Sequence, residues 1–301
     1  MRPWSQARLV VLGFVVLGVA ALAAAPDTSP TIRARSLPTT AGVTAPVATA
    51  NDNTTHRIAD FVTVQKGNLP IIISVPHGGR KKVPDVPERL GKGINNFHTV
   101  RDENTAELAE RFLVELEKLL KGQVWAVIAR FERKYLDVNR AREEGYEHAN
   151  AQPYYDFYHD SLAAACRAVK KQFGRGILLD IHGQAVHPNA ICRGTQNLKT
   201  VTRLHEREGL AAIRGRNSIL GRLEYLGYPV IPAGQANEKV KEVPAFAGGY
   251  IVQTYGSHTD YGIDAIQLEF GSKFRAKDQY GTTALELADA VSVFYKAYLQ
   301  D

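Results

Sequence analysis

The chain has little of several residues and motifs on which common protein classes depend. Only two of its 301 residues are cysteine, which excludes a small scaffold held together by several disulfide bonds. Cys166 and Cys192 allow at most one intramolecular bridge, and the sequence leaves open whether they are bonded or are buried thiols. No G-x-S-x-G or H-E-x-x-H sequence is present, so neither a serine-hydrolase nucleophile elbow nor the common zinc-protease helix is expected.

The chain also lacks a concentrated positive charge. Its formal net charge is +6 at pH 7, and lysine and arginine are spread along the sequence. A nucleic-acid binder usually gathers its basic residues into one compact patch or stripe. We therefore expect no nucleic-acid partner, and the hydrophobic content of 45% is ordinary for a globular domain.

The one long apolar run stands at the N-terminus. Arg2 and Arg8 precede the apolar residues 9–24, and alanines lead up to Pro26. This pattern predicts that residues 1–25 are a signal peptide, whose removal lowers the formal charge from +6 to +4. The alternative is an uncleaved anchor, because the run is near the lower length limit for spanning a bilayer. We expect a secreted or periplasmic protein with no stable membrane association after cleavage.

The rest of the chain divides into a spacer and one domain. Residues 26–55 are rich in Thr, Ala and Pro without an apolar period, which predicts a flexible linker. Residues 56–301 alternate between strand-like and helix-like patterns and are expected to form a single catalytic domain. Strands are predicted at 70–75, 124–129, 135–138, 177–181, 228–231 and 265–268, and helices at 105–121, 154–173, 202–226 and 282–299. Such alternation is typical of an α/β fold with a mixed, mostly parallel central sheet and helices on both faces.

Three of the predicted strands lead into a residue that can bind a metal or transfer a proton. These residues are His77, His182 and Glu269. In open α/β sheets the ligand site lies beyond the carboxyl ends of the parallel strands, so the three side chains are expected to meet at one edge. Each of them alone could be an ordinary polar residue at a strand end. Their coincidence favours a metal-dependent hydrolase.

A catalytic zinc ion usually has three protein ligands and leaves one position for water. His77 and His182 would supply two of these ligands. We expect Asp102 to supply the third, with Glu103 as the fallback. Both acids stand just before the predicted helix at 105–121, where their alternative role is to cap the helix and pair with its dipole.

Glu269 has two interpretations. As a carboxylate at the exit of a buried strand it could be the general base that accepts a proton from the attacking water. It could equally form an ordinary salt bridge at the sheet edge.

Polar and glycine-rich segments complete the predicted site. Arg133, Asn139 and Arg140 offer directed hydrogen bonds and bidentate cations that suit a substrate carboxylate, although Asp137 could instead form a structural ion pair with an arginine. The pair Gly248-Gly249 permits close approach of the backbone to a ligand, or forms only a turn.

Together these stretches resemble the N-formylglutamate amidohydrolase family, which is related to the zinc carboxypeptidases. The resemblance spans roughly residues 71–270 and rests on Ser74-Val75-Pro76-His77-Gly78-Gly79, Asp102, the run from Arg133 to Arg140, Asp180-Ile181-His182, Gly248-Gly249 and Gln267-Leu268-Glu269. It implies a phosphorylase/hydrolase-like α/β fold that holds one zinc ion per chain. It also implies that His77 and His182 are ligands, that Glu269 is the catalytic base, and that Asn139 and Arg140 hold the substrate carboxylate.

Two features depart from the relatives. Zinc carboxypeptidases place a glutamate ligand three residues after the first histidine, but here that position is Arg80. Family members that complete histidine breakdown work in the cytoplasm, whereas this chain is expected to be exported. We therefore expect an exported zinc amidohydrolase that cleaves an N-acyl amino acid, a peptide or a cell-wall fragment with a free carboxylate. Arg133 is the candidate that stabilises the oxyanion. The alternative is a non-enzymatic extracytoplasmic binding protein for a carboxylated ligand on the same scaffold.

Overall fold

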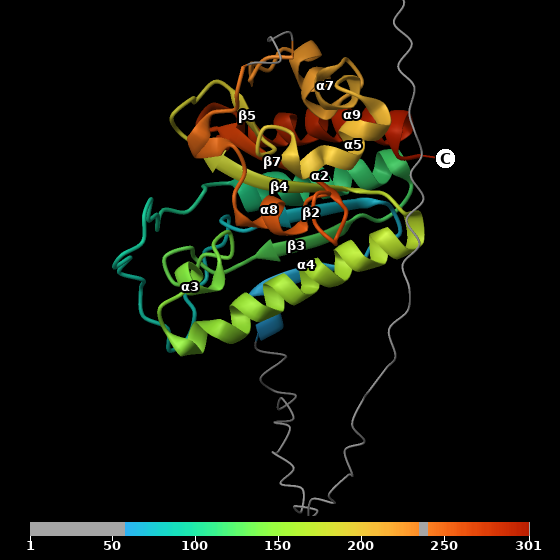
Figure 1. The fold of residues 1–301 in the computed structure, drawn as a ribbon. Helices are drawn as coiled ribbons and strands as arrows, with labels where there is room; N and C mark the ends of the chain where they lie inside the picture. Colours follow the sequence, from blue (N-terminus) through green and yellow to red (C-terminus); the bar gives the residue numbers. More distant parts are fainter. Residues whose placement is uncertain (1–57, 235–239, 301) are drawn as a thin grey trace, which may run out of the picture. The chain divides into compact units, whose positions relative to one another are not determined.

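The computed structural model describes residues 58–234 and 240–300, all within the unit Thr49–Asp301 (Figure 1). The signal peptide expected at 1–25 and the linker expected at 26–55 lie outside the described residues and stay predictions. Among the helices of the described ranges, none combines the length and the apolar character that crossing a membrane requires.

The strands in the described part of the chain form one mixed sheet in the order β1-β3-β2-β4-β7-β5-β6. Their bounds are β1 Val62–Gln65, β2 Ile71–Val75, β3 Trp125–Ala129, β4 Ile177–Gln184, β5 Ile191–Gly194, β6 Val230–Ile231 and β7 Asp264–Gly271. The central strands β3, β2, β4 and β7 run parallel, while β1 pairs antiparallel with β3 and β5 antiparallel with β7. This confirms the predicted mixed, mostly parallel α/β sheet.

Helices cover both faces of the sheet, and a separate apolar core lies under each layer (Figure 1). One layer contains α4 (Gln152–Phe173) and α8 (Tyr250–Tyr255). The other contains α2 (Thr105–Leu120), α5 (Thr202–Glu208), α6 (Ala211–Arg214), α7 (Ile219–Tyr225) and α9 (Tyr280–Tyr298). Strand β2 is mostly apolar because it is buried on both faces: Ile71 and Ile73 pack in one core and Ile72 packs in the other.

Some predicted elements were wrong in detail. Residues 135–138 are turn and irregular backbone and not a strand; the Asp137 N–H donates to the carbonyl of Gly145, the last residue of the short helix α3 (Arg142–Gly145), and not to a neighbouring strand. The helix predicted at 202–226 is broken into α5, α6 and α7, with breaks at Gly209, whose φ is +69°, and at Gly215. Strands β1 and β5, each four residues long, were not predicted.

The two cysteines are buried and unbonded. Cys166 lies on α4 and Cys192 on β5, and both are free thiols. Burial raises the pKa of both thiols, that of Cys192 to about 11, so neither is a reactive thiolate at neutral pH.

Candidate metal centre and active site

Three neighbouring parallel strands bring the candidate residues to one edge of the sheet. His77 lies two residues beyond the end of β2, and the register of β4 and β7 places His182 directly opposite Glu269. Both strands are longer than predicted, so His182 and Glu269 lie within β4 and β7 and do not follow their ends. The predicted convergence nevertheless holds, because the strands are parallel and in register.

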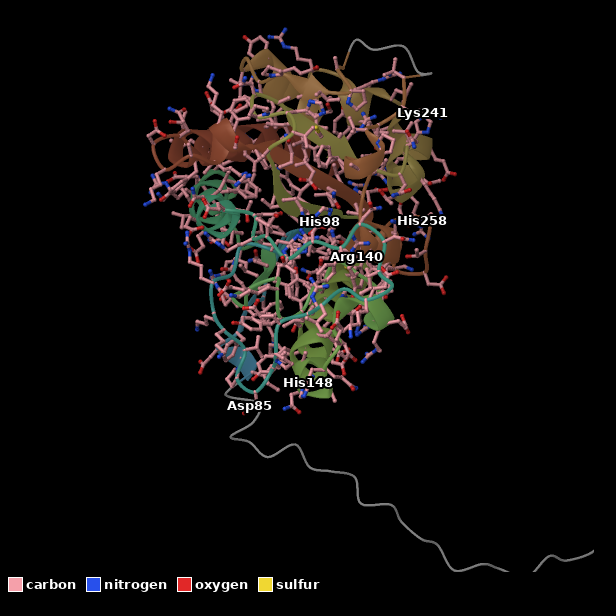
Figure 2. The ribbon with its side chains drawn as sticks, turned by 90° about the vertical axis from the view of Figure 1, so that its left-hand side faces the viewer. Asp85, His98, Arg140, His148, Lys241 and His258 are labelled. Carbon is pink, nitrogen blue, oxygen red and sulfur yellow. The ribbon has the colours of Figure 1, made fainter. Side chains whose placement is uncertain are left out.

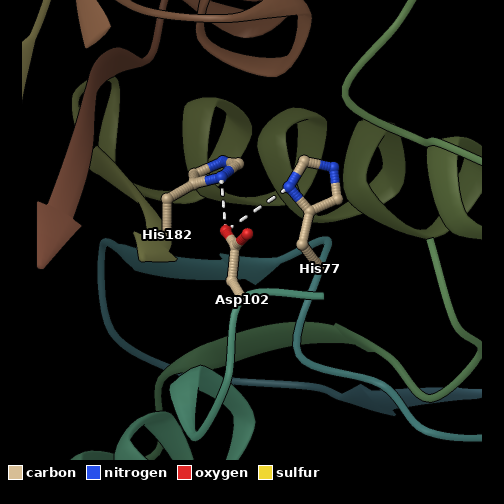
Figure 3. Close-up of side chains that lie close together, drawn as sticks. All are labelled: His77, Asp102 and His182. Atoms are coloured by element: carbon tan, nitrogen blue, oxygen red, sulfur yellow. Dashed lines mark ion pairs between the residues drawn. The ribbon is translucent and has the colours of Figure 1, made fainter. Parts of the chain in front are cut away.

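His77, Asp102 and His182 form a buried group, called the metal group below, that could hold a metal ion (Figure 3). Asp102 Oδ2 is 3.5 Å from His77 Nδ1 and 3.3 Å from His182 Nδ1. The buried His77 Nδ1 has no hydrogen-bond partner, so its lone pair is left for a ligand. Two imidazole nitrogens and one carboxylate oxygen are the ligand set of many catalytic zinc sites, so the residues present fit zinc.

A second carboxylate lies behind each histidine. His77 Nε2 is 2.7 Å from Asp137 Oδ1, and His182 Nε2 is 2.9 Å from Asp180 Oδ2. A proton assigned to each Nε2 from these partners leaves each Nδ1 as the atom that can bind a metal. Asp180 is itself fixed, because its Oδ1 accepts a 2.7 Å hydrogen bond from Ser74 Oγ.

Asp102 joins the group and Glu103 does not. The Gly183 N–H donates to Asp102 Oδ2 at 3.0 Å and fixes the carboxylate between the histidines. The Glu103 side chain is 67% exposed and pairs with Arg101 at 2.8 Å. Burial favours the neutral acid, but His182 and His77 together lower the pKa of Asp102 below its usual range. Asp102 does not cap α2 through its side chain, since the cap residue is Asn104.

Glu269 lies next to this group without belonging to it. Its Oε1 is 4.0 Å from His182 Nδ1 and accepts a 2.9 Å hydrogen bond from Gln267 Nε2. Burial raises the pKa of Glu269 to about 7, although the nearby His182 opposes the shift. A carboxylate with a pKa near neutrality is suited to accept and return a proton.

Arg133 makes the ion pair that was the alternative interpretation of Asp137. Arg133 Nε donates to Asp137 Oδ2 at 2.8 Å, while its Nη1 is 3.9 Å from Asp102 Oδ1. Asp137 therefore supports His77 and holds Arg133 beside the metal group at the same time. The oxyanion role of Arg133 stays a prediction.

Asn139 and Arg140 lie at different depths. Asn139 Nδ2 is 3.3 Å from His182 Nε2, and Asn139 Oδ1 accepts a 2.9 Å hydrogen bond from the Ile251 N–H. Arg140 lies farther out, donates to the Asn96 carbonyl at 2.7 Å, and keeps 26% of its side chain exposed. Figure 2 shows it on the same side of the domain as His98, whose pKa is lowered by burial and by arginines that include Arg140. Contact of Asn139 or Arg140 with a substrate carboxylate stays a prediction.

The two glycines at 248 and 249 allow the close approach that was expected, but to protein side chains. Gly248 has a φ of +117°. A Cβ at Gly249 would lie 2.3 Å from Asn139 Nδ2, and the Gly249 N–H donates to Gln267 Oε1 at 2.7 Å. These glycines therefore let the start of α8 reach the side chains that line the site.

The fold and the buried His-Asp-His group define an α/β protein with a candidate metal centre at the carboxyl edge of its parallel strands. Searches of protein-family models and of curated proteins give no match. Among solved structures, N-formylglutamate amidohydrolase from Ralstonia eutropha JMP134 is similar at a TM-score of 0.51 and 17% identity, over 79% of this chain and 98% of that chain. A gene product from Agrobacterium tumefaciens is similar at a TM-score of 0.50 and 14% identity, over 80% and 95%. These likenesses confirm the fold that the sequence resemblance implied.

Proposed function

We propose that this protein is an exported zinc amidohydrolase, which cleaves the amide of an N-acyl amino acid, peptide or cell-wall fragment that carries a free carboxylate. The observation that carries the proposal is the arrangement of His77 and His182. Both rings direct Nδ1 toward Asp102 (Figure 3). A second carboxylate, Asp137 for His77 and Asp180 for His182, lies behind each Nε2. The Ralstonia protein that shares the fold is named as an amidohydrolase, which supports the same reaction class.

The roles of the protein groups follow from their positions. Zinc held by His77, Asp102 and His182 would supply Lewis-acid polarisation of the scissile carbonyl and a lowered pKa for water. Glu269 accepts the proton of the attacking water at its carboxylate and passes it to the leaving nitrogen. Arg133, held at Asp137 and close to Asp102, faces the oxygen on which negative charge develops.

The free carboxylate of the substrate is assigned to the outer part of the site. Arg140 is partly exposed and carries a guanidinium, which can bind a carboxylate through two parallel hydrogen bonds. Asn139, next to it in sequence, lies against His182 and would orient the end of the substrate nearest the reacting amide. Export is proposed from the apolar and basic pattern of residues 1–25 alone.

The test combines metal analysis with a substrate screen on the purified chain. We expect about one zinc ion per chain, as the ligand set of a single catalytic site requires. We also expect hydrolysis of at least one N-acyl amino acid or peptide, and loss of that activity with a chelator. A protein without zinc that still binds such compounds, and that chelators leave unchanged, would instead be the carboxylate-binding protein. N-terminal sequencing of material recovered outside the cytoplasm tests export separately.

Glu269→Gln tests the proposed base. The amide cannot accept the proton of water, so turnover should fall about 10²–10⁴-fold. Zinc content should stay unchanged, because Glu269 is not in the metal group. Full activity in Glu269→Gln would show that another group is the base.

A further inference from the structure

A glutamine connects the catalytic base to a fixed point of the fold. Gln267 lies two residues before Glu269 on β7, so both side chains project from the same face of the sheet. Gln267 Nε2 donates to Glu269 Oε1 at 2.9 Å, and Gln267 Oε1 accepts the Gly249 N–H at 2.7 Å. Because a backbone N–H can only donate, the amide cannot be reversed, and its NH₂ group must point at Glu269.

The other end of this connection cannot move easily. Gly249 is the N-cap residue of α8, and in the first turn of α8 the Ile251 N–H also donates to Asn139 Oδ1 at 2.9 Å. The far end of α8 is held as well, because Tyr255 Oη is 3.0 Å from His159 Nδ1, whose ring also contacts the Val138 carbonyl. The Gly249 N–H is therefore a fixed anchor, and Gln267 ties Glu269 to it.

The connection matters because Glu269 is close to becoming a metal ligand itself. Its Oε1 is 4.0 Å from His182 Nδ1, the atom that faces Asp102. Carboxylate oxygen is a good ligand for zinc, whereas a catalytic site needs one position left open for water. A modest rotation of the Glu269 side chain would bring a carboxylate into that open position and remove the base.

We propose that Gln267 is a positioning residue that holds Glu269 away from the metal, so that Glu269 remains a proton acceptor and does not become a fourth ligand. This inference rests on the proposed metal site. Without the Gln267 amide, Glu269 loses its hydrogen bond and can turn toward the metal. Loss of Gln267 should therefore tighten metal binding while it slows turnover. A residue with only a structural role would weaken both.

The experiment compares metal binding by the full chain and its variants. Gln267→Leu removes both hydrogen bonds and replaces the amide with an apolar side chain of similar volume. We expect its zinc affinity, measured by competition with a chelator, to rise about tenfold, the scale on which outer groups tune metal sites. The visible absorption of the cobalt-substituted variant should change, because the metal gains a ligand. Both effects should vanish in Gln267→Leu/Glu269→Gln, and turnover should show no further loss relative to Glu269→Gln alone.

Gln184→Leu is the matched control. Gln184 is a buried glutamine on the neighbouring strand β4, and its amide donates to the His187 and Ala190 carbonyls and not to Glu269. Its zinc affinity and cobalt spectrum should remain those of the unaltered protein. Gln267→Met, with an unbranched side chain closer to glutamine in shape, repeats the measurement if Gln267→Leu does not fold.

The outcomes separate the two proposals. Failure of the unaltered protein to bind zinc or cobalt would overturn the metal site, and the role of Gln267 with it. Normal metal binding by the unaltered protein, with an unchanged or weakened affinity and an unchanged spectrum in Gln267→Leu and Gln267→Met, would overturn the role of Gln267 alone.

Discussion

Two buried polar clusters, one around Glu242 beside β5 and the other formed by His77, Asp102 and His182 at β2 and β4, differ in how completely their hydrogen-bonding groups are satisfied. Glu242 accepts hydrogen bonds on both oxygens, from Arg193 Nε and Thr195 Oγ1 on Oε1 and from the Thr195 and Asn197 N–H groups on Oε2, all within 2.9 Å. At His77, Asp102 and His182, by contrast, His77 Nδ1 has no hydrogen-bond partner, and two Nδ1 atoms face one Asp102 oxygen. The Glu242 cluster needs no ligand, whereas the group at His77, Asp102 and His182 has ligand atoms left with which it could hold a metal ion.

His182→Ala should produce the largest effect. The change removes one of two imidazole ligands, so we expect loss of stoichiometric zinc and of measurable hydrolysis. The metal-free protein should lose only about 1–3 kcal/mol of unfolding free energy, because the change also removes the His182 Nε2 hydrogen bond to the buried Asp180. Zinc content and urea unfolding in the presence of a chelator provide the measurements. Retention of one zinc ion per chain would place the metal elsewhere.

Glu242→Ala should have the opposite profile. It leaves the buried Arg193 guanidinium unpaired, and breaking a buried ion pair of this kind costs about 3–5 kcal/mol of unfolding free energy. Zinc content should not change. Urea unfolding measures the loss, and the double change Arg193→Met/Glu242→Leu should recover only the part caused by the unpaired charge, because the Thr195 and Asn197 donors still lack the carboxylate. A loss below about 1 kcal/mol would mean that water replaces the missing carboxylate.

His159, like Glu242, has its hydrogen-bonding atoms paired, since both ring nitrogens have a partner. Its effect on the free energy of unfolding should depend on pH. Burial lowers its pKa from 6.5 to about 4, so the folded state holds the ring neutral. Below pH 6.5 the unfolded chain binds the proton first, and stability falls until the pH reaches about 4. The full loss from this group is about 3 kcal/mol, from roughly 1.4 kcal/mol per pKa unit.

The measurement is the difference in unfolding free energy between pH 7 and pH 4 for the unaltered protein and for His159→Gln. Glutamine can contact the same partners, the Val138 carbonyl and Tyr255, without titrating. The variant should therefore lose about 3 kcal/mol less over this range. An equal loss in both proteins would show that His159 is not a source of acid sensitivity.

The two clusters also mark how far the sequence could predict the site. The meeting of His77, His182 and Glu269 followed from apolar runs that end at one sheet edge. The expectation of Asp102 ahead of Glu103 came from the family resemblance and not from local spacing, because the two are adjacent in a loop; in the structure the Gly183 N–H of β4 fixes Asp102, while Glu103 is exposed and pairs with Arg101. Fold class was predictable from alternation, while the breaks in the helix predicted at 202–226 depended on single glycines.

The residues that hold the site's side chains in place also differ in how far the sequence could predict their contacts. Asp180 and His182 are two residues apart on a strand, a spacing that puts both side chains on one face, so their contact could have been predicted. Gln267 and Glu269 have the same spacing. Asp137 reaches His77 from 60 residues away along the chain, and no local pattern reveals that contact. Local geometry is therefore readable from sequence, and contacts across the fold are not.

Asp180→Asn should give the smallest effect. Asparagine still accepts the His182 Nε2–H but lacks the charge that raises the ligand's basicity, so zinc affinity should fall about 10–100-fold. Ser74→Ala is the matched control, because it removes one hydrogen bond to Asp180 and leaves the carboxylate beside His182 in place. Its zinc affinity should change by less than that of Asp180→Asn in a chelator competition. If the two variants bind zinc equally well, the charge of Asp180 does not raise the zinc affinity. Asp180 would then have only a structural role, as Glu242 does.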